Sequence, residues 1–439
     1  MELNARQAAL ICLERCRREG AWSGRVLDDI IKKASLDKRE ASLAYRLCLG
    51  VLQNTALFDF YIDCYSSVKA KKMEPKVRDI LYLGIYQLLY SNIPARAAVN
   101  ESVGLVRANK FDRAAGLVNA VLRRISENAT ALPEVPNKGT AEHLAIKYSH
   151  SRWLAEILVK EQGYAHTEAF LCGNNLPPAL TIQVNTLKIS ANDYARLLSE
   201  NNIPFERHTF LDSCLTLEGG TVSQLPGFEE GLFYVQDAAA RIAVEIAKPL
   251  PGMKVLDACS APGGKSFAAA LLMENSGKIV SCDIHEKKLR LVNEGASRLG
   301  IGIISTMAAD GRKYIEDFAS SFDLVIADVP CSGIGVIRKK PEIRWKEASD
   351  VASLPQIQLD ILENLCRYVK PGGTLLYSTC TVLKAENEDV VSAFLEKHKD
   401  FTLQPFAVGE LSAPDGMHCF WPLTDGTDGF FAAKLKRLR

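Results

Sequence analysis

Two cysteines stand where the sequence could provide a sulfur nucleophile. Cys331 lies in Asp328-Val-Pro-Cys-Ser-Gly333, and Cys380 lies in Ser378-Thr-Cys380. Each follows an apolar run directly, in a turn-forming polar context, whereas the ordinary free cysteine is buried among apolar side chains. A thiol at the rim of a crevice that can become a thiolate is a nucleophile. No histidine stands beside either cysteine, so a protease with a Cys–His pair has little support.

A glycine-rich turn indicates a ligand of a second kind. Ala261-Pro-Gly-Gly264 separates a predicted strand from a predicted helix, and Asp283 follows Gly263 by 20 residues at the end of the next apolar run. Such a turn lets a ligand approach the backbone and the helix N-terminus, and an acid at this distance typically accepts hydrogen bonds from ribose hydroxyls. The pattern favours a nucleoside-containing cofactor. The spacing differs from G-x-G-x-x-G, so S-adenosylmethionine fits better than a dinucleotide, although the turn alone leaves this open.

The elements that position these residues alternate between strand and helix from Gly252 onward. The predicted strands are 254–259, 279–283, 304–307, 323–328 and 374–378, and the predicted helices are 266–273, 286–299, 356–369 and 386–397. Apolar strands between amphipathic helices predict a parallel sheet covered on both faces, with its ligand at the carboxyl ends of the strands. Four aspartates fall at or just beyond such ends: Asp257, Asp283, Asp310 and Asp328.

The chain before this sheet has a different pattern. Residues 1 to about 128 predict only helices, among them 5–19, 42–52, 77–89, 98–108 and 113–125, which form a compact bundle. A linker rich in turn residues, 128–140, leads to a middle section in which helices 151–162 and 190–201 alternate with strands near 180–185, 209–217 and 232–235. We therefore predict three parts: an all-helical domain 1–139, a small α+β subdomain 141–249 and a catalytic α/β domain 250–439.

Composition excludes several classes of protein. The net charge is +1, but residues 1–139 hold 22 Lys and Arg against 15 Asp and Glu. This excess suits an RNA partner as well as a solvated helical surface, and its clusters are Lys69, Lys71, Lys72, Arg123 and Arg124. No apolar run could span a bilayer, and the N-terminus lacks the order of a signal peptide. The 12 cysteines include no C-x-x-C pair, which favours reduced thiols in a cytoplasmic protein.

The motifs resemble a known family. Asp257-Ala-Cys-Ser-Ala-Pro-Gly-Gly-Lys265, Asp328-Val-Pro-Cys-Ser-Gly333 and Ser378-Thr-Cys380 look like the signature motifs of the RNA cytosine-5 methyltransferases, in the same order. With the helical prefix, the chain resembles the RsmB branch (also called Fmu or Sun) of bacterial 16S rRNA methyltransferases, whose N-terminal domain is similar to NusB. The resemblance covers nearly the whole chain. The family often has alanine where this chain has Ser260.

The resemblance implies a fold and roles for single residues. The fold is that of a class I S-adenosylmethionine-dependent methyltransferase, Rossmann-like with a mostly parallel sheet. Asp283 is expected to hold the ribose hydroxyls, Asp310 to lie beside the adenine, and Asp328 to lie near the sulfonium and the target base. Cys380 is the expected nucleophile, and Cys331 is expected to assist release of the product. The residues expected to line the cofactor pocket are Cys259, Ser260, Ala261, Pro262, Gly263, Gly264 and Lys265.

The expected reaction transfers a methyl group to C5 of a cytosine in 16S rRNA, free or in an early assembly intermediate, without a metal and by a monomer. Attack of Cys380 on C6 makes C5 nucleophilic, and either Cys331 or a water that it positions takes part in loss of the C5 proton. The basic run Arg338-Lys-Lys340, with Arg344 and Lys346, could hold the RNA backbone or be a solvated loop. Three alternatives stay open: the same chemistry on tRNA or another RNA, a non-catalytic RNA-binding or antitermination factor, and a nucleotide-dependent oxidoreductase, which the loop spacing disfavours.

Overall fold

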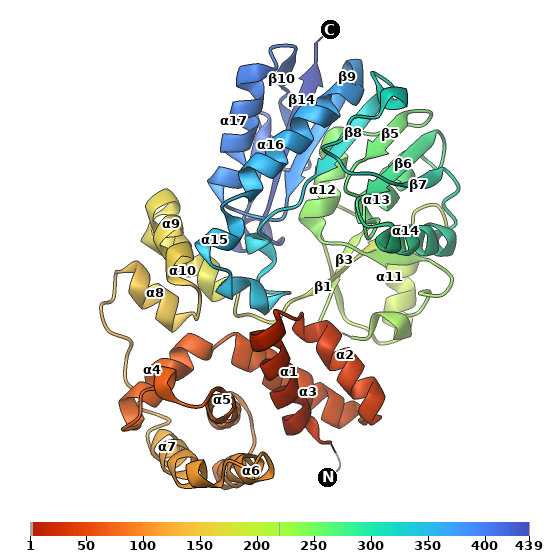
Figure 1. Ribbon diagram of the computed structural model, residues 1–439. Helices are drawn as coiled ribbons and strands as arrows, with labels where there is room; N and C mark the ends of the chain where they lie inside the picture. The colour runs from red at the N-terminus through yellow and green to blue at the C-terminus, as the bar shows by residue number, and fades with distance from the viewer. Residues whose placement is uncertain (1–2, 219, 439) are drawn as a thin grey trace. The chain divides into compact units, whose positions relative to one another are not determined.

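The structure is a computed structural model that describes residues 3–218 and 220–438, and it divides into two compact units. Unit 1 contains the chain up to Leu176 together with Ile337–Ala348 (Figure 1). Unit 2 contains Pro177–Val336 and the chain from Ser349 onward. The chain therefore leaves unit 1, returns to it for twelve residues and leaves it again. We call the returning segment, Ile337–Ala348, the arm.

Unit 1 is helical. Its helices are α1 (Ala5–Glu19), α2 (Ser23–Ala34), α3 (Lys38–Leu52), α4 (Thr55–Tyr65), α5 (Pro75–Tyr90), α6 (Ala95–Ala108), α7 (Ala115–Glu127), α8 (Ala141–Lys147), α9 (Arg152–Gln162) and α10 (Tyr164–Gly173). Local chemistry sets several starts: the Asn4 side chain caps α1, Asp37 caps α3, and Pro75 is the first residue of α5. The apolar faces of α1 to α7 share one core cluster. The predicted all-helical prefix is confirmed, and it also contains α2 and α4, which were not among the predicted helices.

Unit 2 begins with a small sheet. Its antiparallel strands lie in the order β2 (Phe205–Arg207), β3 (Cys214–Leu217), β1 (Leu180–Val184) and β4 (Phe233–Val235). Helix α11 (Ala191–Glu200) supplies Tyr194 and Leu198 to the apolar cluster of this sheet. The predicted α+β character of the middle section is therefore present. The boundaries predicted at 139 and 249 stay a prediction.

The large sheet of unit 2 has the order β10 (Phe401–Leu403), β14 (Phe430–Arg437), β9 (Val369–Thr379), β8 (Phe322–Asp328), β5 (Lys254–Asp257), β6 (Lys278–Asp283) and β7 (Ile304–Ala308), with β13 (Met417–Phe420) beside β14. Strands β5 to β9 are parallel, and β14 runs antiparallel to β9. The mostly parallel sheet is confirmed. The antiparallel edge was not predicted, because the apolar run of β14 shows no direction of its own.

Helices cover both faces of this sheet (Figure 1). Side chains alternate along β8, so that Leu324 and Ile326 join one core cluster and Val325 and Ala327 join the other. The first cluster includes α12 (Ala238–Ala247), α13 (Gly264–Leu272) and α14 (Glu286–Leu299). The second includes α16 (Leu354–Leu365) and α17 (Glu388–Lys397). Across the described ranges, no helix is long and apolar enough to cross a membrane.

Candidate active site

The candidate site lies at the carboxyl ends of the parallel strands of unit 2. Along the chain, β5, β6 and β7 build the sheet outward in one direction, while β8 and β9 build it in the other. The strand order therefore reverses between β5 and β8, and ligands of open α/β sheets bind at such a reversal. The predicted aspartates end the strands on both sides of this point: Asp257 ends β5 and Asp328 ends β8.

The glycine-rich turn approaches its surroundings closely. Gly263 has φ +112°, which glycine adopts without strain, and a Cβ there would lie 2.5 Å from Phe267 Cζ. A Cβ at Gly264 would lie 3.1 Å from Gln236 Nε2. Ser260 is buried, and its Oγ has no hydrogen-bond partner in the described chain. A tight turn with an unsatisfied hydroxyl suits a polar ligand, so these residues fit the predicted nucleoside cofactor.

Asp283 presents one carboxylate oxygen to the site. Its Oδ1 accepts a hydrogen bond from His285 N at 2.8 Å, and no donor within the described residues reaches Oδ2. The carboxylate is 8 % exposed, whereas the next side chain, Ile284, is 56 % exposed. An acceptor beside an exposed apolar side chain suits a ribose with its attached base. Ile284 was not predicted, because it continues the apolar run of β6.

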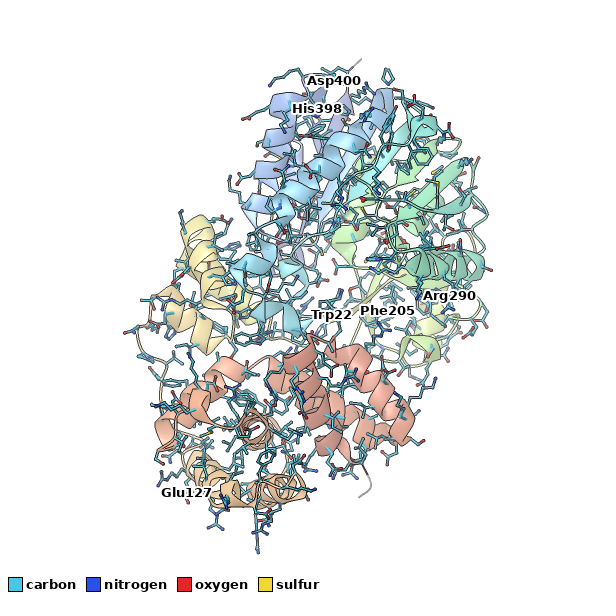
Figure 2. The ribbon with its side chains drawn as sticks, in the orientation of Figure 1. Trp22, Glu127, Phe205, Arg290, His398 and Asp400 are labelled. Carbon is cyan, nitrogen blue, oxygen red and sulfur yellow. The ribbon has the colours of Figure 1, made fainter. Side chains whose placement is uncertain are left out.

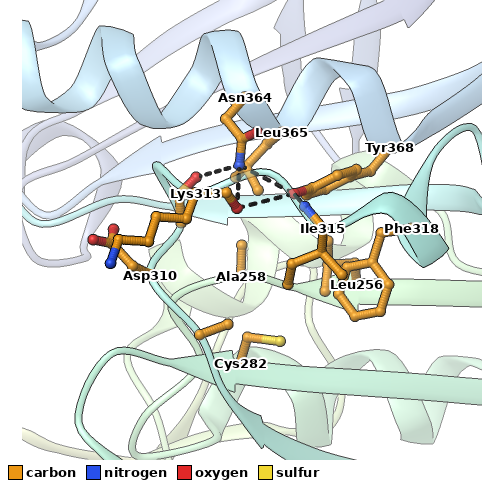
Figure 3. A pocket seen from close by; sticks show the side chains of 12 residues that line it. Leu256, Ala258, Cys282, Asp310, Lys313, Ile315, Phe318, Asn364, Leu365 and Tyr368 are labelled. Carbon is orange, nitrogen blue, oxygen red and sulfur yellow. Dashed lines mark hydrogen bonds between the residues drawn. The ribbon is translucent and has the colours of Figure 1, made fainter.

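Asp310 is engaged by its own neighbour. Arg312 binds both carboxylate oxygens, Nε–Oδ1 at 3.0 Å and Nη2–Oδ2 at 2.9 Å, and these hydrogen bonds hold the pKa of Asp310 below its ordinary value. Asp310 also lines a pocket of about 10 Å³ beneath Tyr368 and Asn364 (Figure 3). That space is far smaller than the roughly 300–1,000 Å³ of ordinary ligand pockets. The predicted place of Asp310 beside an adenine stays a prediction.

Asp328 is fixed on two sides. Its Oδ2 lies 2.7 Å from Lys265 Nζ, and its Oδ1 accepts from Ser378 Oγ at 2.8 Å. Lys265 is 8 % exposed, and its ammonium lies 5.0 Å from the centroid of the Phe430 ring. The helix that follows the turn therefore delivers a cation to the end of β8. The sequence predicted Lys265 and Asp328 as site residues, but it did not predict that they form an ion pair.

Asp257 ends β5, the strand that pairs with β8, and it is fully buried. Its Oδ2 accepts from Ser266 Oγ at 2.7 Å, and Ser266 Oγ lies 2.7 Å from Ser281 Oγ. Burial raises the pKa of Asp257 to about 7; the Ser266 hydrogen bond opposes this shift and Asp328 adds to it. Asp257 therefore belongs to the buried framework near the ion pair.

The two cysteines meet. Cys331 Sγ lies 3.1 Å from Cys380 Sγ, and Cys380 N donates to Cys331 Sγ at 3.3 Å. Both thiols are free and half-buried. The pKa of Cys331 is raised well above its ordinary value by the hydrogen bond with Cys380 and by burial. The two sulfurs are therefore placed so that one thiol can donate a hydrogen bond to the other.

A buried carboxylate holds the cysteine loops together. Glu386 Oε2 accepts from Ser332 N and from Gln358 Nε2, both at 2.8 Å, and Gln358 Nε2 also donates to Pro330 O at 3.0 Å. Glu386 and Gln358 are 1 % and 0 % exposed. The sequence did not identify either residue, because each stands in an ordinary amphipathic helical pattern. They position the loop that carries Cys331.

The prediction that the basic run after Cys331 holds the RNA backbone is wrong for one residue, Arg344. Arg344, which lies in the arm, is fully buried in unit 1. Burial lowers its pKa to about 9, so it stays cationic at neutral pH. Its guanidinium donates to oxygens of Pro341, Gln53, Tyr148, Ser149, Asn174 and Asn175. Arg344 is therefore buried away from any phosphate, and its role is structural.

Other residues of the arm contact unit 1 as well. Trp153 Nε1 donates to Lys346 O at 2.7 Å, and Glu342 Oε1 accepts from Ser23 N. Lys340 Nζ lies 5.4 Å from the centroid of the Trp22 ring, at the start of α2 (Figure 2). The arm is thus an integral part of unit 1. For Arg338, Lys339 and Lys346, contact with RNA stays a prediction.

Three family models match separate stretches of the chain. The model described as 16S rRNA methyltransferase RsmB/F matches residues 244–436, the NusB family model matches residues 3–127, and a ferredoxin-like domain model of RsmF/B-like methyltransferases matches residues 150–223. Within the described chain, no cluster of three or more His, Cys, Asp or Glu side chains could hold a metal ion.

Relatives match over almost the full length. The probable ribosomal RNA small subunit methyltransferase B of Bacillus subtilis is 34% identical, over 99% of both chains. Ribosomal RNA small subunit methyltransferase B of Serratia proteamaculans is 33% identical, also over 99% of both. Among solved structures, PH0851 has a TM-score of 0.82 at 28% identity and covers 99% of this chain and 98% of its own. A methyltransferase homologue from Pyrococcus horikoshii has a TM-score of 0.60 at 29% identity and covers 68% of this chain and 99% of its own.

Proposed function

The chain belongs to the RsmB/F family of S-adenosylmethionine-dependent 16S rRNA methyltransferases, and we propose that it methylates C5 of a cytosine through a covalent bond between Cys380 and C6. The substrate is 16S rRNA, free or in an early assembly intermediate, and the enzyme acts as a monomer. The observation that carries this proposal is the cysteine pair: two sulfurs 3.1 Å apart at the ends of adjacent strands, beside Asp328.

The bound cofactor supplies an electrophilic methyl group, and the residues of the turn and of β6 are arranged to hold it. The unsatisfied hydroxyl of Ser260 and the second carboxylate oxygen of Asp283 provide polar partners, and Gly263 and Gly264 let the turn pack closely against Phe267 and Gln236. The turn ends at α13, whose first backbone N–H groups favour negative charge such as a carboxylate. Cys259, Ala261 and Pro262 complete the predicted lining, with Lys265 at its inner end.

The ion pair of Lys265 and Asp328 prepares the base. The Asp328 carboxylate can accept a hydrogen bond from the exocyclic amino group of cytosine. Lys265 is a donor at 2.7 Å from that carboxylate, so the pair can stabilise the charge that develops around N3 when a thiolate adds to C6. Ser378 holds the second oxygen of Asp328 and keeps the carboxylate oriented. The target base must leave any helix before it can reach these groups.

The two cysteine sulfurs have different roles in the reaction: Cys380 attacks C6, and Cys331 assists release. The Cys380 thiolate forms a bond to C6, and the electron pair of the C5–C6 double bond moves to C5. That pair would form the bond from C5 to the methyl carbon as the bond between this carbon and the cofactor sulfur breaks and leaves its electrons on that sulfur. The C5 proton leaves to a base, the C5–C6 double bond forms again, and the S–C6 bond breaks. The protonated Cys331 donates to the departing Cys380 sulfur. A water that Cys331 positions accepts the C5 proton, because Cys331 keeps its own proton until the Cys380 sulfur departs.

Single cysteine variants test this assignment. We expect Cys380→Ala to be inactive and to form no bond to RNA. Cys331→Ala should attack and methylate but release slowly, so a protein–RNA adduct should accumulate that survives denaturing electrophoresis and disappears on addition of a thiol. The double variant should form no adduct. Cys64→Ala, at an exposed cysteine of α4, is the matched control.

The substrate is tested with labelled S-adenosylmethionine and purified 16S rRNA or tRNA, followed by mapping of 5-methylcytosine.

For the cysteine variants, an adduct with Cys380→Ala and none with Cys331→Ala means that the two roles are reversed. Full activity of both single variants removes the covalent mechanism. Label in tRNA alone moves the same chemistry to another RNA.

A further inference from the structure

Unit 1 contains a pocket of about 560 Å³ that has no part in the site of unit 2. Its walls come from α4, the end of α5, the segment 132–138, α8 and the end of α10. The volume lies within the range of about 300–1,000 Å³ that is typical of ligand sites. Two of its lining side chains, Tyr90 and Leu176, are each 49 % exposed, so the pocket opens to solvent.

One wall of this pocket is a fixed aromatic platform. Tyr90 stacks on Tyr86, with ring centroids 5.6 Å apart and an interplanar angle of 20°, and it also packs 6.1 Å from Phe58. Its position is therefore set by packing while about half of its surface stays open. Tyr61 and Tyr148 line the same pocket. Aromatic faces held in this way stack with nucleic-acid bases in a sequence-tolerant manner.

A second wall offers an unused hydrogen-bond acceptor. His143 Nδ1 lies 3.0 Å from Val135 O and 3.1 Å from Pro136 O, and since both are acceptors, Nδ1 carries the proton. In the neutral ring, Nε2 is then an acceptor. His143 is 6 % exposed, and its Nε2 has no hydrogen-bond partner among the described residues. An unsatisfied buried acceptor in a pocket wall indicates a ligand with an N–H or O–H group.

One charged residue of the pocket, Lys138, offers its ammonium to an anionic group of a ligand. Lys138 is exposed and belongs to no ion pair in the described ranges, and Lys147 is half-buried and bound to Glu168. Glu134 adds one exposed carboxylate. A stacking ring, a buried acceptor and a nearby ammonium match the base, the amino or hydroxyl donors and the phosphate of a nucleotide.

We propose that this pocket binds one unpaired nucleotide of the RNA substrate, outside the target base. The base stacks on Tyr90, a donor of the nucleotide meets His143 Nε2, and Lys138 attracts the phosphate. The inference rests on the proposed function for its RNA ligand, but it concerns recognition and not chemistry. Arg344 donates to Tyr148 O and Asn175 Oδ1, and both of these residues line the pocket, so the wall that receives the nucleotide also holds the arm.

Binding of a fluorescein-labelled strand of ten adenosines to the full-length protein tests the platform. Tyr90→Ala should weaken binding roughly 5- to 100-fold, the loss expected for one base–aromatic stack, with an unchanged salt dependence because no charge is removed. Tyr90→Phe keeps the ring and should bind like the wild type. Equal affinities of Tyr90→Ala and the wild type overturn the proposal.

Two further variants keep the proposal testable if Tyr90→Ala is unstable. His143→Asn keeps a donor toward Val135 O and Pro136 O but leaves no acceptor at the position of Nε2, so it should weaken binding several-fold. Cys172→Trp places a large ring at an exposed lining position and should block the pocket without changing Tyr90. Wild-type affinity in both variants, with thermal midpoints unchanged, also overturns the proposal.

Photo-crosslinking separates this inference from the proposed function. RNA that contains 4-thiouridine should crosslink to peptides of 132–148 and 86–90 in the wild type and less in Tyr90→Ala. If the wild type methylates 16S rRNA but no crosslink falls on these peptides, the pocket serves another ligand and the inference fails alone. If the wild type binds neither S-adenosylmethionine nor RNA, the proposed function fails. S-adenosylmethionine affinity should be equal in all pocket variants.

Discussion

Two buried cations, Lys265 in unit 2 and Arg344 in unit 1, are neutralised by different means. In unit 2, Lys265 is paired with a carboxylate, Asp328, at 2.7 Å, and its ammonium faces the ring of Phe430. In unit 1, Arg344 is fully buried and forms no ion pair with any described residue. Its partners are five backbone carbonyls and the amide oxygen of Asn175.

The difference follows from what each cation holds. Backbone carbonyls cannot move without the chain, so Arg344 ties the arm to Gln53 and to the segment 148–149 at the end of α8. The carboxylate of Asp328 belongs to a side chain that is 29 % exposed, so Lys265 can exchange part of that contact for a ligand. Partners that cannot move indicate a structural role for Arg344. A partner that can be exchanged for a ligand indicates a role for Lys265 in the active site.

Removal of Arg344 should have the largest effect on stability. In Arg344→Met, several buried carbonyls lose their donor, and the free energy of unfolding should fall by about 3–5 kcal/mol. Urea denaturation of the full-length protein measures this fall. Arg344→Lys should recover only part of it, because an ammonium cannot reproduce the planar fork. A fall below about 0.5 kcal/mol, no larger than for Arg113→Met on the surface of unit 1, would contradict the structural role.

The dependence of the free energy of unfolding on pH tests the role of Asp257, which is buried near Lys265 and Asp328. Its pKa is raised from 3.8 to about 7, so the folded protein holds a proton that the unfolded chain has already released between these values. Its contribution to stability is present below about pH 4 and is lost as the pH rises to about 7, a change on the order of 4 kcal/mol. The difference in urea unfolding between wild type and Asp257→Asn should therefore vary across this window. A constant difference from pH 4 to pH 8 would remove Asp257 from this role.

Lys265→Met should affect rate more than folding. The variant leaves Asp328 without its cation, and loss of one preorganised electrostatic partner typically lowers kcat by about 10²–10³-fold. Single-turnover methylation of 16S rRNA measures the rate, and urea denaturation measures the stability. The opposite result would be a Lys265→Met protein that is destabilised as strongly as Arg344→Met but methylates at the normal rate when folded. Lys265 would then have the structural role and no part in the reaction.

Asp283→Ala should have the smallest effect of the four. If Asp283 binds the ribose hydroxyls, S-adenosylmethionine affinity should weaken by roughly 1.5–3 kcal/mol, the range for hydrogen bonds to a charged group. Calorimetry measures this loss, and Asp317→Ala, an exposed aspartate of the same unit, is the control. Affinity equal to that of the wild type excludes Asp283 from the pocket.

Lys265 and Arg344 also show which parts of a site can be predicted from the sequence and which cannot. Lys265 was predicted as a site residue because its motif is local: a turn between strand and helix fixes where the next side chain goes. Arg344 was misassigned because a basic run looks alike whether it is solvated, bound to phosphate or buried, and its partners lie between 169 and 291 residues away, apart from Pro341. Glu386 and Gln358 were missed for the same reason, since burial of a polar side chain is decided by tertiary packing.

The arm belongs to unit 1 but comes late in the chain, and this fixes when the hydrogen bonds of unit 1 can form during synthesis. When the chain up to Leu176 has left the ribosome, the carbonyls of Gln53, Tyr148, Ser149 and Asn174 await a guanidinium that lies about 170 residues further on. At roughly 5–20 residues per second, Arg344 follows about 10–35 s later. During that interval most of the second unit is also being made. The helical unit thus emerges first but completes its hydrogen bonds only after the segment that carries Cys331 has been synthesised.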